Sequence, residues 1–165
     1  MNTFYNIVNY YTPFLSHFDT NQVFIYNSTI QLLNIMTTQL FKITQNVIIQ
    51  NQEKAVLILK HNTGKWLLPG GKIQKGESWI DALKREIKEE TKITEFEVKK
   101  ILDIDSWTEN EIGYYVATFV AQALEADKIT LSDEHIDYAW VKLSDLDNYD
   151  FWHENIKKRI KKALL

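Results

Sequence analysis

Residues 71–93 read GKIQKGESWIDALKREIKEETKI, and the rest of the sequence is best interpreted outward from this stretch. Ser78 is followed three positions later by Asp81, a pair that can satisfy the free backbone amides of a first helical turn. Bulky aliphatic side chains then recur at the spacing of one helix face. They are Ile80, Leu83 and Ile87. The sequence therefore predicts an amphipathic helix that begins after Ser78 and is preceded by a glycine-containing loop.

Three glutamates share one edge of the predicted helix. Glu86, Glu89 and Glu90 stand at positions i, i+3 and i+4, so their carboxylates emerge next to one another. Repulsion at that spacing costs roughly a few tenths of a kcal/mol per pair, and a bound divalent cation would turn it into attraction. Carboxylates are hard oxygen ligands of the kind that Mg²⁺ and Mn²⁺ bind. The alternative is an ordinary solvated helix face rich in glutamate.

Strand patterns lie on both sides of this helix. Residues 42–49 and 55–60, the latter with the apolar run 56–59 inside, read as two strands joined by a polar turn, and they predict an opening β-hairpin. The proline and two glycines at 69–71 are interpreted as a break. Strands separated by one helix and followed by another indicate an α/β fold, a mixed sheet covered by helices. The remaining predicted elements are strands at 66–68, 97–104, 113–121 and 138–141 and a closing amphipathic helix at 153–164.

Composition limits the classes of function. The chain has 165 residues, with 19 Lys or Arg against 22 Asp or Glu, and its net charge of -3 does not indicate a general nucleic-acid binder. It contains no cysteine, which excludes disulfides, thiolate metal sites and a cysteine nucleophile. The sequence has neither an apolar run long enough to span a membrane nor a secretory signal pattern. We therefore expect a cytoplasmic protein with no membrane partner and no stable nucleic-acid partner.

The first 35 residues differ from the remainder of the chain. They hold 8 of the 21 aromatic residues, six asparagines and a single charged side chain, Asp19. Such a segment is unlike a flexible linker, which would be polar and poor in aromatics. We therefore divide the chain into an aromatic and Asn-rich N-terminal extension at 1–35 and a main domain at 36–165. The extension packs on the main domain, pairs with another subunit, stays poorly ordered, or precedes a physiological start at Met36.

Residues 71–93 resemble the Nudix box, the pattern G-x5-E-x7-R-E-U-x-E-E-x-G-U in which U is a bulky aliphatic residue. The match begins with Gly71 and Glu77 and continues through the run REIKEETKI at 85–93. The pattern departs at Lys92, where the family has a glycine that ends the helix in a left-handed turn. Lysine there should cost on the order of 1 kcal/mol or shift the helix end. Flanking patterns similar to those of the family occur at 66–71, 76–78, 134–135 and 140–141.

The resemblance implies a Nudix-type α/β/α sandwich with a mixed sheet. It also implies a MutT-like hydrolase that cleaves a nucleoside diphosphate linked to another group and requires Mg²⁺ or Mn²⁺. By the same resemblance, Glu86, Glu89 and Glu90 would be the catalytic residues and metal ligands, and one of them would orient or deprotonate the attacking water. The backbone carbonyl of Gly71 would be a further metal ligand.

Other positions surround this set. Within the resemblance, Glu77 and Arg85 look like supporting residues that hold the loop against the helix, and Arg85 is also a candidate for substrate binding. An ordinary surface ion pair is the alternative. Lys72 follows the glycine pair and could steady a phosphate, although many exposed loop lysines have no such role. Glu134 lies where relatives often place an extra carboxylate near the metals, and Asp133 is its competitor.

The substrate is the least determined part of this interpretation. Signatures of the ADP-ribose, NADH and coenzyme A groups are missing, which leaves a compact enzyme that converts nucleoside triphosphates to the monophosphate and pyrophosphate. Nucleotide-sugar or dinucleoside polyphosphate hydrolysis and a catalytically silent nucleotide-binding module are the alternatives. A P-loop is rejected because Glu77 occupies the position that requires lysine. We expect a small-molecule nucleotide as ligand and a monomer or homodimer.

Overall fold

The computed structural model describes residues 39–124 and 128–165 of the chain. The N-terminal extension predicted at 1–35 and the alternative start at Met36 lie outside the described residues, so the division of the chain at that point stays a prediction. Within the described ranges, no helix has the length and apolar character that crossing a membrane requires.

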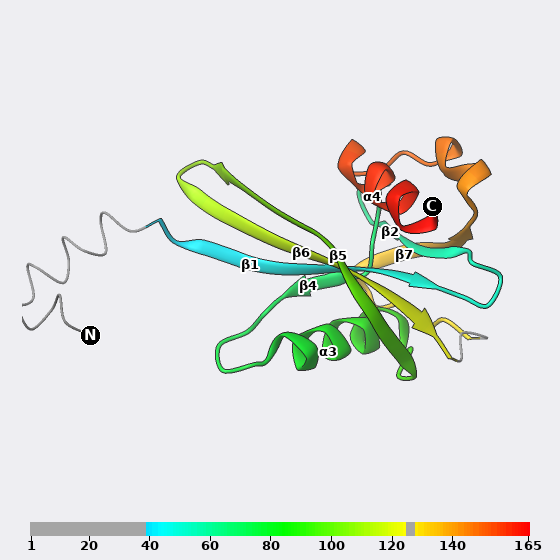
Figure 1. The fold of residues 1–165 in the computed structure, drawn as a ribbon, viewed down its shortest axis with the longest axis horizontal. Coiled ribbons are helices and arrows are strands. Elements are labelled where there is room, and N and C mark those ends of the chain that lie inside the picture. Colours follow the sequence, from blue (N-terminus) through cyan, green and yellow to red (C-terminus); the bar gives the residue numbers. More distant parts are fainter. Residues whose placement is uncertain (1–38, 125–127) are drawn as a thin grey trace, which may run out of the picture. The chain divides into compact units, whose positions relative to one another are not determined.

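A mixed sheet lies at the centre of the fold (Figure 1). Its strands are β1 (Phe41–Gln50), β2 (Val56–His61), β3 (Trp66–Leu67), β4 (Gly70–Lys72), β5 (Phe96–Glu109), β6 (Ile112–Ala123) and β7 (His135–Val141). The main path runs in the order β3-β2-β1-β6-β5, while β4 pairs with β1 and β7 pairs with β2. The pairing of β1 with β6 is parallel, and the other pairings of these strands are antiparallel. The helices are α3 (Trp79–Thr91), the 3-10 helix η1 (Leu143–Asn148) and α4 (Glu154–Leu164).

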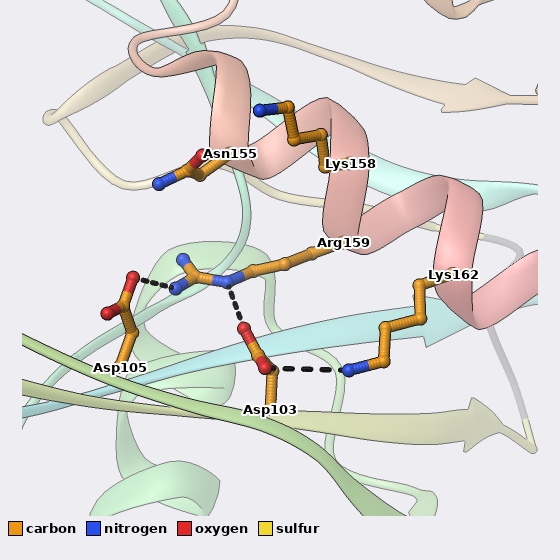
Figure 2. A pocket seen from close by; sticks show the side chains of 6 residues that line it. All are labelled: Asp103, Asp105, Asn155, Lys158, Arg159 and Lys162. Carbon is orange, nitrogen blue, oxygen red and sulfur yellow. Dashed lines mark hydrogen bonds and ion pairs between the residues drawn. The ribbon is translucent and has the colours of Figure 1, made fainter.

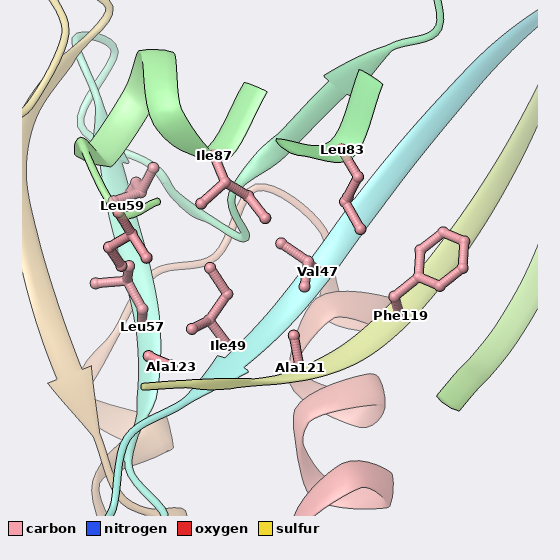
Figure 3. Packing of buried hydrophobic residues seen from close by; sticks show 10 residues of the cluster. Val47, Ile49, Leu57, Leu59, Leu83, Ile87, Phe119, Ala121 and Ala123 are labelled. Carbon is pink, nitrogen blue, oxygen red and sulfur yellow. The ribbon is translucent and has the colours of Figure 1, made fainter. Parts of the chain in front are cut away.

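Residues 47–49 of β1 and 56–59 of β2 are buried on both faces of the sheet. On β1, Val47 and Ile49 pack in the cluster that includes α3, whereas Ile48 between them packs in the cluster that includes α4. Residues 56–59 of β2 alternate in the same way, and Figure 3 shows the α3 side of this core. Burying one such side chain contributes roughly 1.5–3 kcal/mol, so these runs hold helices on both faces. The predicted α/β/α sandwich with a mixed sheet is confirmed.

The predicted opening hairpin is confirmed, since β1 and β2 are antiparallel neighbours. The predicted length of β5 is wrong, because the strand continues past residue 104 to Glu109, which pairs with Ile112 of β6. The turn residues Asn110 and Glu111 have φ angles of 48° and 65°, a left-handed geometry that suits a tight hairpin. The polar run at 105–109 is therefore a strand because it pairs with β6, not because of its own pattern. Likewise, β7 begins before the predicted residue 138, and η1 has no predicted counterpart.

The glycine pair before α3 forms a strand instead of the predicted break. In β4, Gly70 and Gly71 pair with Asn46 and Gln45 of β1. Gly70 has a φ of 143°, and a Cβ atom there would lie 2.1 Å from the carbonyl oxygen of Gln45. Only glycine lets the two backbones approach this closely. The glycines thus mark a contact that brings the loop before α3 onto the central strand.

The predicted helix after Ser78 is confirmed as α3, and both of its ends have defined caps. The Ser78 Oγ accepts a 3.2 Å hydrogen bond from the backbone N–H of Asp81. At the other end, Lys92 adopts a left-handed conformation with a φ of 61° and donates its backbone N–H to the Lys88 carbonyl at 3.1 Å. Lysine thus takes the geometry that glycine provides more easily, and the backbone carries a strain of about 1 kcal/mol at this residue.

Ion pairs fix α4 to β5, as Figure 2 shows. Arg159 is 8% exposed, and its guanidinium donates to Asp103 at 3.0 Å and to Asp105 at 3.1 Å. Lys162 adds a contact of 3.5 Å to Asp103. The Arg159 hydrogen bond and the charge of Lys162 hold the pKa of Asp103 below its ordinary value. A charged link therefore supplements the apolar packing of α4 on the sheet.

Replacing Lys92 by glycine should stabilise the fold by about 0.5–1 kcal/mol, because glycine adopts the left-handed geometry without strain. The matched control is Lys88→Gly, an exposed position inside the last turn of the same helix, where glycine should cost about 1 kcal/mol. Urea denaturation gives the free energy of unfolding of both variants. Equal destabilisation by the two substitutions would contradict the strain at residue 92.

The ion pairs of Asp103 should contribute stability that is lost in acid. Because the pKa of Asp103 in the folded state lies below its ordinary value of 3.8, the contribution is complete above that value and is lost as the pH falls through the folded-state pKa. Asp103→Asn should therefore lower the free energy of unfolding at neutral pH and converge with the wild type in acid. Arg159→Met, which keeps apolar contacts but removes the charge, should weaken the fall of the free energy of unfolding as the pH is lowered. Parallel stability curves for wild type and Asp103→Asn would refute this expectation.

Candidate functional site

Glu90 is the most buried of the three glutamates on α3. Its side chain is 8% exposed, and Oε2 accepts a 2.9 Å hydrogen bond from the backbone N–H of Gly70. Burial raises the pKa of Glu90 to about 8, and the Gly70 hydrogen bond opposes this shift. The negative charges of Glu86, Glu134 and Glu89 raise the pKa further. Glu90 is therefore a desolvated carboxyl group with three others close enough to repel its charge.

The Glu86 carboxylate lies directly against Gly71. A Cβ atom on Gly71 would lie 2.3 Å from the Glu86 Cδ and within 2.6 Å of both carboxylate oxygens. The side chain is 18% exposed, and Oε1 accepts a 2.8 Å hydrogen bond from Nη1 of Arg85. Any side chain at position 71 would thus displace this carboxylate. Glycine leaves the space that the Glu86 carboxylate occupies.

Glu89 lies at the rim of the set. Its side chain is 58% exposed, and Oε2 accepts a 3.1 Å hydrogen bond from the same Arg85 nitrogen that binds Glu86. The three predicted carboxylates therefore occupy one region beside the Gly70 and Gly71 backbone, with two of them largely shielded from solvent. Their metal-binding and catalytic roles stay predictions.

Arg85 links the loop before α3 to the helix itself. Its Nε and Nη2 donate to the two carboxylate oxygens of Glu77 at 2.8 and 3.0 Å, and Nη2 also donates to the Lys72 carbonyl at 3.1 Å. The hydrogen bond with Arg85 lowers the pKa of Glu77, and Glu77 in turn raises the pKa of Arg85. These contacts are those expected of residues that hold the loop in place. The Lys72 side chain is exposed, and substrate binding by Arg85 or Lys72 stays a prediction.

The segment before β7 is tied to the C-terminal end of α3. The backbone N–H of Thr130 donates to the Thr91 carbonyl at 3.1 Å, and that of Ser132 donates to the Glu90 carbonyl at 3.3 Å. These bonds bring Glu134, which is exposed in the following turn, close enough for its charge to raise the pKa of Glu90. The metal-binding role of Glu134, with Asp133 as its competitor, stays a prediction.

The chemistry of this donor set fits a hard divalent cation. The carboxylates that surround Glu90 supply only oxygen donors and a negative charge that Arg85 offsets in part. In the part of the chain that the structure describes, no three His, Asp or Glu side chains are close enough as they stand to hold one ion. Arg85 draws Glu86 and Glu89 to itself, and like charges keep the carboxylates apart. Binding would therefore require the carboxylate side chains to rotate towards the cation.

Two contacts around Glu90 have no local signal in the sequence. The Gly70 amide reaches Glu90 because β4 pairs with β1 instead of forming a turn. His135, predicted only as part of a flanking pattern, has a side chain that is 2% exposed, and its Nε2 lies 3.7 Å from Oε1 of Glu90. In the sequence, only the position of His135 directly after Glu134 indicates that it could lie near the carboxylates.

Comparisons with known proteins agree with this arrangement. Residues 40–163 match the protein family described as the NUDIX domain. The chain is 36% identical over 98 residues to the nucleoside triphosphatase NudI of Escherichia fergusonii, an alignment that covers 53% of this chain and 68% of that relative. NudI of Klebsiella pneumoniae is 31% identical over 96 residues, with the same shares of 53% and 68%.

Solved structures share the fold. The crystal structure of a MutT protein from Methanosarcina mazei Go1 has a TM-score of 0.65 and 28% identity, and the match covers 75% of this chain and 93% of that chain. An Ap4A hydrolase of C. elegans has a TM-score of 0.64 at 21% identity over 74% of this chain and 94% of that chain, a likeness of fold alone. Since the family match extends over most of the chain and includes the carboxylate-bearing helix, this protein belongs to the Nudix hydrolase family.

Proposed function

We propose that this chain hydrolyses a nucleoside triphosphate to the nucleoside monophosphate and pyrophosphate, with Mg²⁺ or Mn²⁺ as its cofactor. The observation that carries the proposal is the placement of the α3 carboxylates: Glu90 accepts from the Gly70 N–H, Glu86 lies against Gly71, and Glu89 shares Arg85 with Glu86. Oxygen donors with excess negative charge, two of them largely shielded from solvent, favour binding of a divalent cation. The relationship to NudI proteins, named as nucleoside triphosphatases, supports the choice of substrate class.

The roles of the residues follow from their positions. A divalent cation bound there would neutralise phosphate charge and acidify a water molecule. One of the glutamates would accept the proton of the attacking water, whose oxygen forms a bond to phosphorus as the bridging P–O bond breaks and its electron pair leaves with pyrophosphate. The proposed cation donors are Glu86, Glu89, Glu90, the Gly71 carbonyl and Glu134.

Positively charged residues would complete the site. Arg85 binds Glu77 through one part of its guanidinium, and its Nη1 lies next to Glu86 and Glu89. The positive charge would limit the repulsion between these two carboxylates before the substrate binds. Lys72 at the end of β4 would meet a phosphate oxygen, and Arg85 is a second candidate for that contact. Positioning and electrostatic stabilisation of this kind supply most of the rate in phosphoryl chemistry.

A panel of nucleotides tests the proposal directly. With Mg²⁺, the purified full-length chain should release pyrophosphate and nucleoside monophosphate from at least one nucleoside triphosphate, and EDTA should abolish the reaction. The panel should include nucleotide sugars and dinucleoside polyphosphates, whose cleavage in place of triphosphates would establish the alternative substrate class. No turnover of any of them would favour a silent nucleotide-binding module.

Glu90→Gln serves as the site control for that panel. The substitution should lower turnover by on the order of 100-fold or more, since removing a ligand should cost at least as much as losing one of its outer partners. The fold should stay intact, because glutamine resembles the protonated carboxyl group that burial favours and can still accept from the Gly70 N–H. Glu109→Gln, an exposed position at the tip of β5, is the matched variant that should keep the wild-type rate.

Gly71→Ala should reduce turnover with little loss of stability. The new methyl group would occupy the place of the Glu86 carboxylate, which is the flexible end of a side chain and can rotate away. We expect a fall in kcat of about 10-fold or more, consistent with the cost of misplaced catalytic groups. Thermal unfolding of Gly71→Ala should change little. Gly64→Ala, where nothing lies within 4 Å of the new Cβ but a φ of 89° strains alanine, should lose some stability and keep full activity. Wild-type kcat in Gly71→Ala would argue against a role for the observed Glu86 position.

A further inference from the structure

His135 is buried next to Glu90, and the proposed reaction does not use it. It is the first residue of β7, its side chain is 2% exposed, and its Nε2 lies 3.7 Å from Oε1 of Glu90. Gly70 already donates to the other oxygen, Oε2, at 2.9 Å. The two oxygens of one buried carboxylate therefore face two different protein groups from two different elements.

An irregularity of the sheet places this histidine. β2 and β7 pair Lys60 with Asp137 and then His61 with His135, so Ile136 is an extra residue on β7. A bulge of this kind redirects the side chains beside it, and such bulges are common next to active sites. The backbone N–H of His135 also donates to the Ser132 carbonyl at 3.1 Å. The backbone of His135 is thus fixed both by its pairing with β2 and by its hydrogen bond to the preceding loop, and this fixes the position from which the imidazole extends.

The surroundings of the ring determine which nitrogen can face Glu90 with a proton. A neutral imidazole has one donor and one acceptor nitrogen, so the partner of one nitrogen decides the role of the other. The Nδ1 of His135 lies 3.4 Å from the Ser132 Oγ. If the serine hydroxyl donates to Nδ1, the ring proton resides on Nε2 and points to Glu90. A distance of 3.7 Å is too long for a hydrogen bond, and such contacts commonly shorten when a ligand binds.

We propose that His135 is a positioning residue for Glu90, donating from Nε2 to Oε1 while the Gly70 N–H holds Oε2, so that the carboxylate presents its remaining lone pairs to a divalent cation in one orientation. The inference rests on the proposed function, because it assigns a partner to one of the proposed metal ligands. Groups that orient metal ligands from outside the coordination sphere typically affect metal affinity or activity by 10–100-fold.

The test measures Mn²⁺ affinity of the full-length chain by electron paramagnetic resonance, which needs no substrate. His135→Ala should bind Mn²⁺ about 10–100-fold more weakly than wild type. His135→Gln, whose side-chain amide can donate to Glu90, should recover most of that loss. In turnover assays, kcat should fall in the same order while KM for the nucleotide stays close to that of the wild type, because the His135 side chain is 2% exposed and is not among the residues proposed to bind the nucleotide.

A neighbouring histidine provides the matched control. His61 makes an edge contact with the His135 ring at 6.4 Å between centroids, so His61→Ala removes packing around His135 but not the proposed donor. This variant should keep wild-type Mn²⁺ affinity. Equal losses in His61→Ala and His135→Ala would show that packing alone matters and would overturn the proposal. So would wild-type affinity in His135→Ala, or a Gln variant no better than Ala.

Folding and function can be separated from this outcome. If His135→Ala does not give a cooperative thermal transition, His135→Leu, which fills a similar volume without a donor, takes its place and should show the same loss of Mn²⁺ affinity. In one outcome, the wild type binds Mn²⁺, the His135 variants bind it more weakly, and no nucleotide of the panel is turned over. That outcome would overturn the proposed function and leave this inference standing. A wild-type chain that binds no Mn²⁺ would overturn both.

Discussion

The hydrogen bond from Gly70 to Glu90 joins the C-terminal part of α3 to the centre of the sheet. Gly70 belongs to β4, whose approach to Gln45 of β1 leaves no space for a side chain. Residues 47–49 of β1, directly after the residues that pair with β4, are packed on both faces, so a shift of β1 would disturb two apolar clusters. The Glu90 carboxylate is therefore fixed with respect to the core. Sites built on rigid elements hold their geometry more accurately than sites on loops.

The same burial places an electrostatic cost inside the folded chain. Glu90 is desolvated and lies close to three other carboxylates, while Arg85 binds only the two outer glutamates of α3. The apolar face of α3, with Leu83 and Ile87 fully buried, offsets that cost. Such a balance is usual where a site is arranged for a ligand and not for the stability of the free protein. Glu77 forms an ion pair with Arg85 from the loop before α3, and its side chain is as shielded from solvent as that of Glu86.

Features that depend on one segment alone were predictable from the sequence. Ser78 and the apolar spacing after it predicted α3, and the strand patterns at 42–49 and 55–60 predicted the opening hairpin. Features that depend on a distant partner were not predictable in this way. The polar end of β5 is a strand because β6 pairs with it, and β4 exists because β1 accepts it. His135 and the Gly70 amide reach Glu90 through such long-range pairings, which no local pattern encodes.

The parallel pairing of β1 with β6 joins two strands that are far apart in the sequence. Phe41 pairs with Gly113 and Gln50 with Gln122, so each contact closes a loop of roughly 70 residues. Closing such a loop costs chain entropy before the contacts form, which slows folding. During synthesis, the hairpin of β1 and β2 emerges long before β6 and exposes apolar side chains on both faces in the meantime. The nascent chain is therefore prone to aggregate, and would benefit from a chaperone, between the emergence of β2 and that of β6.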